Sequence, residues 1–199
     1  VGTLLGQRQH GHMQAVGYNL YCKMLNEAVL RLRGGKNVED DDFETVADIQ
    51  TDAFIPDSYI KNEALKLDIY RRIAAVENKE EQEDMLEELI DRFGDPPTAV
   101  MNLLEITLLR GLAHSLYITE VKARPDMITF TMYEKAKIRV DKIPELLEQM
   151  GGNMMFRHAE PAQFICRLQG GRRRFSGTIL EITREVLEEM CVLREEEEK

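Results

Sequence analysis

Residues 55–116 read IPDSYIKNEALKLDIYRRIAAVENKEEQEDMLEELIDRFGDPPTAVMNLLEITLLRGLAHSL. They decide the fold because they contain the clearest helix start and stop signals in the chain. They predict three helices in series. The first starts after Pro56, where a side-chain oxygen of Asp57 or Ser58 accepts a hydrogen bond from the first turn, and it stops near Asn78. Its apolar face, spaced by four residues, consists of Leu65, Ile69 and Ile73.

The second and third helices are joined by a tight corner. Residues 80–93 form the second helix, and the carboxylates of its first turn suit the positive end of the helix dipole. Gly94 ends it in a left-handed turn, Asp95 caps the third helix and Pro96 takes its first position. The apolar row of the third helix is Val100, Leu104, Leu108 and Leu112.

Helices and strands also alternate outside this stretch. Residues 13–32 predict an amphipathic helix, residues 36–48 an acidic, solvated linker, and residues 46–54 a strand at a sheet edge. After the third central helix, alternation with a period of two predicts two antiparallel hairpins, at residues 118–133 and 154–168. Further helices are predicted at residues 142–150 and 176–193. This order predicts an α+β domain with an N-terminal arm.

Composition limits the class of protein. The 199 residues suffice for one domain with a core, and the net charge of −10 argues against a free-standing nucleic-acid binder, because phosphate neutralisation dominates such binding. No apolar run approaches the ~18 residues of a membrane span, and the first residues do not resemble a signal peptide. Cys22, Cys166 and Cys191 are far apart, which favours buried or idle thiols of a cytosolic protein.

No motif in the chain indicates chemistry. The sequence holds no phosphate-binding G-x-x-x-x-G-K-[ST] loop, no G-x-G-x-x-G and no G-x-S-x-G, and its four histidines lack metal-ligand spacing. We therefore expect no catalytic residue, metal or cofactor in this chain. One basic cluster, Arg172, Arg173 and Arg174, is a candidate phosphate contact; a charged turn before the last helix is the competing interpretation.

Four stretches, in order and spacing, resemble the C-terminal part of the bacterial transcription-repair coupling factor (Mfd) family. They are LLGQRQHG at residues 4–11, VGYNLY at 16–21 with MLNEAV at 24–29, IPDSYI at 55–60 with LDIYRRIA at 67–74, and ELIDRFG at 88–94. The first is similar to the end of the translocation motif that this family shares with the RecG helicase. It departs from that motif at His10, where the family has a small serine.

The resemblance implies a division of the chain. Residues 1–12 would be an arm that ends the translocation motif, with Gly6, Gln9 and Gly11 as its remnant, and residues 13–199 would be the regulatory C-terminal (TRCF) domain. Gln9 would couple ATP hydrolysis to movement on DNA, because its amide both donates and accepts hydrogen bonds. Without the motor domains, which would lie upstream and bind ATP and Mg²⁺, this piece would not be an enzyme.

The resemblance also implies partners. The whole protein would be a cytoplasmic bacterial DNA translocase that pushes stalled RNA polymerase off damaged DNA and recruits the excision-repair protein UvrA. The C-terminal domain would mask an N-terminal UvrA-binding module by intramolecular contact until polymerase is engaged. The alternative function is an accessory nucleic-acid-binding module that uses Arg172 to Arg174.

Overall fold

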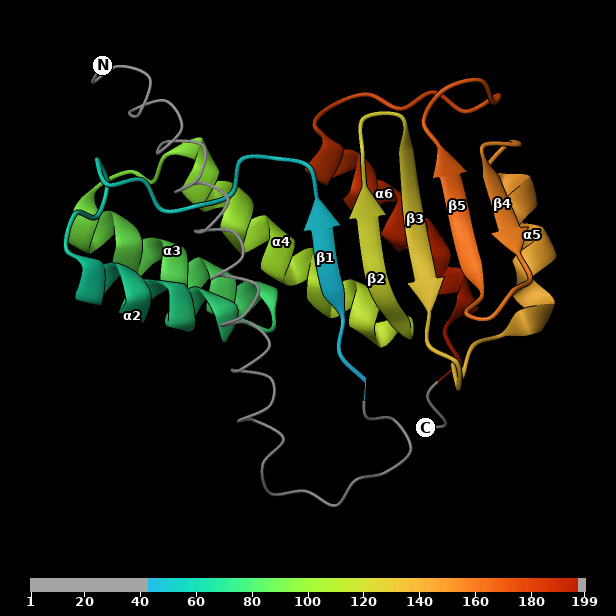
Figure 1. Cartoon of the computed structure of the whole chain (residues 1–199), viewed down its shortest axis with the longest axis horizontal. Coiled ribbons are helices and arrows are strands. Elements are labelled where there is room, and N and C mark those ends of the chain that lie inside the picture. The colour runs from blue at the N-terminus through green and yellow to red at the C-terminus, as the bar shows by residue number, and fades with distance from the viewer. Residues whose placement is uncertain (1–42, 197–199) are drawn as a thin grey trace, which may run out of the picture. The chain divides into compact units, whose positions relative to one another are not determined.

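The computed structural model describes residues 43–196, so the predicted helix at residues 13–32 and the predicted arm lie outside the described residues. The fold is α+β, as predicted (Figure 1). The described chain divides into two compact units, which we describe separately. The helical unit contains residues 52–108, and the sheet unit contains residues 43–51 and 109–196.

The helical unit consists of α2 (Glu63–Ala74), α3 (Lys79–Phe93) and most of α4 (Thr98–Ser115). Its core side chains are almost fully inaccessible to solvent; they include Ile69, Ile73, Leu89, Val100, Leu103 and Leu104. The four-residue connection from Ala75 to Asn78 returns the chain so that α3 packs on α2. An ion pair from Arg72 to Glu88 joins the two helices and holds the pKa of the Glu88 carboxyl below its usual value.

The first helix begins later than the sequence predicted. Its N-cap is Asn62, whose side chain accepts from the Leu65 N–H over 2.9 Å, and not Asp57 or Ser58. The preceding segment is held by tertiary hydrogen bonds instead: the Tyr59 hydroxyl donates to the Gly94 carbonyl over 2.8 Å, which fixes Tyr59 at the end of α3. Asn78, predicted to stop α2, instead caps α3 by accepting from the Glu81 N–H.

The helix corner is confirmed in part. Gly94 ends α3 with a φ of 84°, as its position predicted. However, α4 begins at Thr98 and not at Pro96. The reason is Pro97, because a proline disfavours helical backbone in the residue before it, which here is Pro96. Leu108 and Leu112 are only half-buried, since the buried side of α4 turns through Leu103, Ile106, Leu109 and Ala113.

The sheet unit contains one five-stranded sheet in the order β1-β2-β3-β5-β4. The strands are β1 (Val46–Ile49), β2 (Ile118–Ala123), β3 (Met127–Met132), β4 (Met154–Arg157) and β5 (Gln163–Arg167). Both predicted hairpins are present, and β1 is at an edge as expected. The parallel pairing of β1 with β2 was not predicted. β1 is shorter than the predicted strand, because the chain turns after Ile49, where the Thr51 N–H donates to the Ile49 carbonyl.

Helices α5 (Ile143–Gln149) and α6 (Ile179–Met190) cover the same face of the sheet (Figure 1). Their buried side chains meet those of the strands, with Phe130 and Phe164 fully buried in adjacent strands. α6 begins three residues later than predicted, because Gly177 has a φ of 105° and cannot join a helix. Thr178 is the cap, and its hydroxyl accepts from the Glu181 N–H.

Residues 43–45 correct the prediction of a solvated linker up to residue 48. The ring of Phe43 is 8% exposed and stacks on His114, with ring centroids 4.3 Å apart, and on Tyr133, at 4.6 Å. Thr45 is fully buried, and its hydroxyl donates to the Ile118 carbonyl over 2.6 Å. These contacts hold the start of β1 against the start of β2.

Replacing this aromatic anchor tests its contribution to the fold. We expect Phe43→Ala to lower the free energy of unfolding by about 3 kcal/mol, because a buried, stacked ring is lost. Urea denaturation measures this change. Val140→Ala is the control, since Val140 is 68% exposed and its loss should change stability by less than about 0.5 kcal/mol. Equal stability of the two variants would show that residues 43–45 are a solvated linker after all.

Candidate functional site

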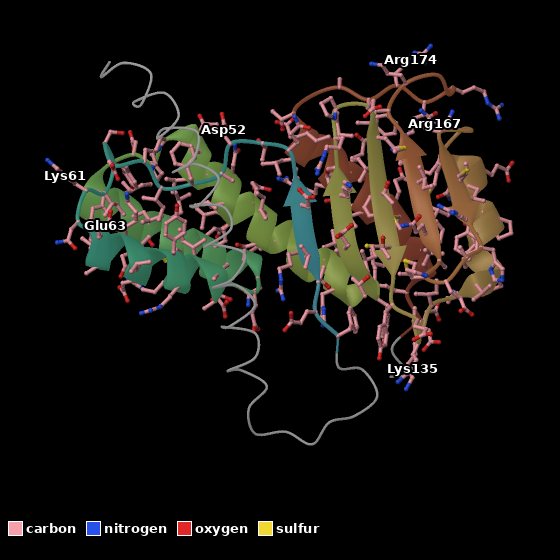
Figure 2. All side chains as sticks on the ribbon, in the orientation of Figure 1. Asp52, Lys61, Glu63, Lys135, Arg167 and Arg174 are labelled. Atoms are coloured by element: carbon pink, nitrogen blue, oxygen red, sulfur yellow. The ribbon has the colours of Figure 1, made fainter. Side chains whose placement is uncertain are left out.

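The predicted basic cluster lies in the loop that joins β5 to α6. We call residues 170–174 the basic loop. The structure gives its three arginines different surroundings: Arg172 and Arg174 are exposed, whereas Arg173 is half-buried. Figure 2 shows Arg174 near the end of the sheet where Arg167 finishes β5.

Asn153 holds the basic loop in place. Asn153 is only 2% exposed. Its Nδ2 atom donates to the carbonyl of Arg167 over 2.9 Å and to the carbonyl of Arg173 over 3.3 Å. Its Oδ1 atom accepts from the Arg173 N–H over 3.1 Å. One buried amide therefore joins β5 to the basic loop, and it leaves none of these inward-facing groups unpaired.

Gly171 is required by this close approach. A Cβ atom at Gly171 would lie 1.8 Å from Oδ1 of Asn153 and 2.2 Å from its Cγ. The backbone of Gly171 is not in the left-handed region, so the need for glycine is one of space. The basic loop can therefore pass Asn153 only where a side chain is missing.

Arg173 is bound within the protein. Its Nη2 atom donates to Glu185 over 2.7 Å and to Glu189 over 2.8 Å, two carboxylates one turn apart on α6. Its guanidinium also lies 5.5 Å from the centre of the Phe175 ring. These two carboxylates raise the pKa of the Arg173 guanidinium although burial acts against the charge. Arg173 thus fastens the loop to α6, and Arg172 and Arg174 carry its outward charge.

A hollow of about 390 Å³ lies beside the basic loop. Its apolar walls are Pro125, Leu168, Phe175 and Ile182, and Arg174 is at its rim. It lies just before the start of β3 and just after the end of β5, where the Leu168 N–H donates to the Asp126 carbonyl. Sequence reasoning found the arginines but not the hollow, because its walls come from three separate segments: the β2–β3 turn, the loop after β5, and α6.

A second charged feature lies on α3, in the helical unit. Four of its six exposed carboxylates recur at helical spacing along one face, and we call these four the acidic stripe: Glu80, Glu83, Glu87 and Asp91. Ile90, next to Asp91, is 41% exposed although it is a large aliphatic residue. Sequence reasoning assigned the carboxylates of the first turn, Glu80 and Glu83 among them, to the positive end of the helix dipole, and it did not single out Glu87 or Asp91.

The structure bears on the other sequence predictions as follows. Gly6, Gln9 and Gly11 lie outside the described residues, so their role stays a prediction. Within residues 43–196, no three His, Cys, Asp or Glu side chains are grouped as metal ligands, and no helix there is long and apolar enough to cross a membrane. Cys166 is fully buried, and burial raises the pKa of its thiol to about 11.

Comparison with known proteins gives one consistent result. The model of the TRCF domain matches residues 49–143, from the end of β1 to the start of α5. The transcription-repair-coupling factor of Staphylococcus haemolyticus is 38% identical over 160 residues, which is 80% of this chain and 13% of that protein. The factor of Bacillus subtilis is 36% identical over 152 residues, 75% of this chain and 13% of that protein.

A solved structure agrees. It is the crystal structure of the C-terminal domain of a transcription-repair coupling factor, matched with a TM-score of 0.53 and 26% identity over 74% of this chain and 94% of that one. Fold and sequence together define an α+β TRCF domain. The chain belongs to the transcription-repair coupling factor family and corresponds to its C-terminal domain. It spans about an eighth of the length of the curated relatives that it matches.

The contact between Asn153 and Gly171 can be tested with a double-mutant cycle. We expect Gly171→Ala to cost about 2 kcal/mol of stability, because the new methyl group collides with the Asn153 amide. Asn153→Ala should cost a similar ~2 kcal/mol, since it leaves buried backbone groups unpaired. In the Asn153→Ala background, Gly171→Ala should cost less than about 0.5 kcal/mol, as denaturation of all four proteins would show. Additive costs would contradict the proposed collision.

The buried thiol predicts a pH dependence of stability. The folded protein keeps Cys166 protonated up to its raised pKa of about 11, whereas the unfolded chain loses this proton near the ordinary value of 9. The stabilisation is therefore complete below pH 9 and is lost as the pH rises to 11. Between these limits the wild type should lose roughly 2 kcal/mol more stability than Cys166→Ala. Parallel stability curves for the two proteins would show that burial leaves this pKa unchanged.

Proposed function

We propose that this chain is the regulatory domain of a transcription-repair coupling factor, and that it covers the UvrA-binding module of the same protein at rest. The proposal is supported by the membership of the TRCF family and by a surface suited to reversible contact. The whole protein would be a cytoplasmic DNA translocase that displaces stalled RNA polymerase and recruits UvrA. ATP and Mg²⁺ would bind in its motor domains, where Gln9 would contribute to coupling.

The acidic stripe is the observation that carries this proposal. Four exposed carboxylates on one face of α3 create a negative surface, and the exposed Ile90 beside them adds apolar contact area. Such a surface fits a basic partner that has an apolar side chain among its cations. We assign this role to the UvrA-binding module, which would then be masked wherever α3 covers it.

The energetics suit a contact that must open. Exposed ion pairs contribute about 0–1 kcal/mol each, so the acidic stripe alone would not hold two separate proteins together firmly. Within one chain, however, the tether supplies an effective concentration on the order of millimolar, which makes a weak contact sufficient. Engagement with polymerase then needs only a few kcal/mol to release the domain.

Neutralising the acidic stripe tests the masking. In the full-length protein, changing Glu80, Glu83 and Glu87 to Gln and Asp91 to Asn should raise the affinity for UvrA about tenfold, because the closed state is weakened. Surface plasmon resonance with immobilised UvrA measures this affinity. A full-length protein truncated before residue 43 gives the upper limit of the effect.

The matched control removes the same charge elsewhere. Glu134, Glu148, Glu160 and Glu188 are exposed and lie in the sheet unit, and changing all four to Gln should leave the affinity for UvrA unaltered. Added salt should raise the affinity of the wild type toward that of the acidic-stripe variant, since screening weakens the closed state. An unchanged affinity of both the acidic-stripe variant and the truncated protein would refute masking.

A further inference from the structure

We propose that the hollow beside the basic loop is a second binding site, which takes an acidic protein segment that carries a large apolar side chain. This site belongs to the sheet unit, and the acidic stripe contributes nothing to it. It rests on three features of the described chain: a hollow with four apolar side chains among its lining residues, the outward Arg174 in that lining with the exposed Arg172 two residues before it, and a loop that is rigid before any partner binds.

The hollow determines the apolar part of the partner. Its volume of about 390 Å³ is at the lower end of the ~300–1,000 Å³ typical of ligand pockets. Pro125, Leu168, Phe175 and Ile182 present carbon surface to it. A phenylalanine, leucine or methionine side chain fits such walls, and burying it there gives the affinity that exposed charges alone do not supply.

The arginines determine the charge of the partner. Arg174 lines the hollow, Arg172 is exposed two residues before it, and Arg167 is exposed at the end of β5. Within the described residues, none of the three side chains makes an ion pair. Arg173, by contrast, is neutralised by Glu185 and Glu189. On a protein with a net charge of −10, this gathering of free cations favours carboxylates as the partner groups.

The basic loop is arranged for binding before the partner arrives. Asn153 fixes its backbone, Arg173 fastens it to α6, and the Arg174 Nη1 atom donates to the Gly171 carbonyl over 2.8 Å. Little conformational entropy therefore remains to be lost on binding, which lowers the cost of association.

A nucleic acid fits the same surface less well. Only two of the loop's three arginines face outward, and the Phe175 ring already lies under the guanidinium of Arg173 instead of offering an open stacking face. The apolar walls, moreover, give no contact to phosphate. The observations therefore favour a protein segment.

The test uses the 199-residue chain labelled with ¹⁵N and a short capped peptide in which one phenylalanine is flanked on both sides by glutamates. Titration should shift the backbone amides of Leu168, Gly170, Arg174 and Phe175 with a single affinity. The same peptide with alanine in place of phenylalanine should bind about tenfold more weakly, as should the peptide with glutamines in place of glutamates.

Charge reversal provides the matched pair of variants. Arg172→Glu with Arg174→Glu should weaken the binding of the phenylalanine peptide at least about tenfold. Arg71→Glu with Arg157→Glu makes the same change in net charge at exposed positions that do not line the hollow, and it should leave the affinity within about twofold. Far-ultraviolet circular dichroism of both variants confirms that they are folded.

Three results would overturn the proposal. The first is a set of shifted amides that lies away from the hollow. The second is an equal loss of affinity in both pairs of variants, which would indicate only long-range attraction. The third is tighter binding of oligothymidylate than of the peptide at the same amides, which would show a nucleic-acid site. None of these results depends on UvrA, so a failure of this proposal would leave the masking proposal standing. Likewise, a failure of the masking proposal would leave this one standing.

Discussion

The parallel pairing of β1 with β2 is the constraint on which the rest of the structure depends. Parallel neighbours cannot be joined by a tight turn, so the chain must leave the sheet after Ile49 and return at Ile118. The helices α2, α3 and α4 form that long crossover. Phe43 and Thr45 hold the start of β1 at the point where the crossover ends, by stacking on His114 and by a hydrogen bond to the Ile118 carbonyl.

This arrangement gives each unit one distinct charged surface. On α3 the carboxylates face outward because the apolar side of the helix, through Met85 and Leu89, is buried against its neighbours. In the basic loop, one of the three arginines is bound inside the protein: Asn153 accepts from the backbone N–H of Arg173, and a carboxylate of α6 accepts from its guanidinium. The neighbours Arg172 and Arg174 remain exposed to solvent. An acidic protein thereby acquires a local basic site without a basic composition.

Much of the fold could be predicted from the sequence, because periodicity and turn residues report local structure. Gly94 marked the end of α3, and the alternation of Ile128, Phe130 and Met132 marked β3. The errors arose where residues distant in the sequence determine the boundary of a helix or the pairing of a strand. Tyr59 is bound to the end of α3, which delays α2 to Asn62, and the partner of β1 is more than seventy residues away. For the candidate site, the three arginines were evident from the sequence, but only the folded structure distinguishes the ion-paired Arg173 from its two exposed neighbours. The spacing of Glu185 and Glu189, one turn apart, was the available signal.

The central claim is that α3 covers another part of the same protein at rest. Carboxyl footprinting measures this directly: a carbodiimide with glycine ethyl ester labels exposed carboxylates, and mass spectrometry reads the labelling of each peptide. In the resting full-length protein, the acidic stripe should be labelled several-fold less than in the 199-residue chain, and saturating UvrA should restore the labelling. Glu160, in the sheet unit, should be labelled equally in all three states. Equal labelling of the acidic stripe in the full-length protein and in the isolated chain would contradict the account.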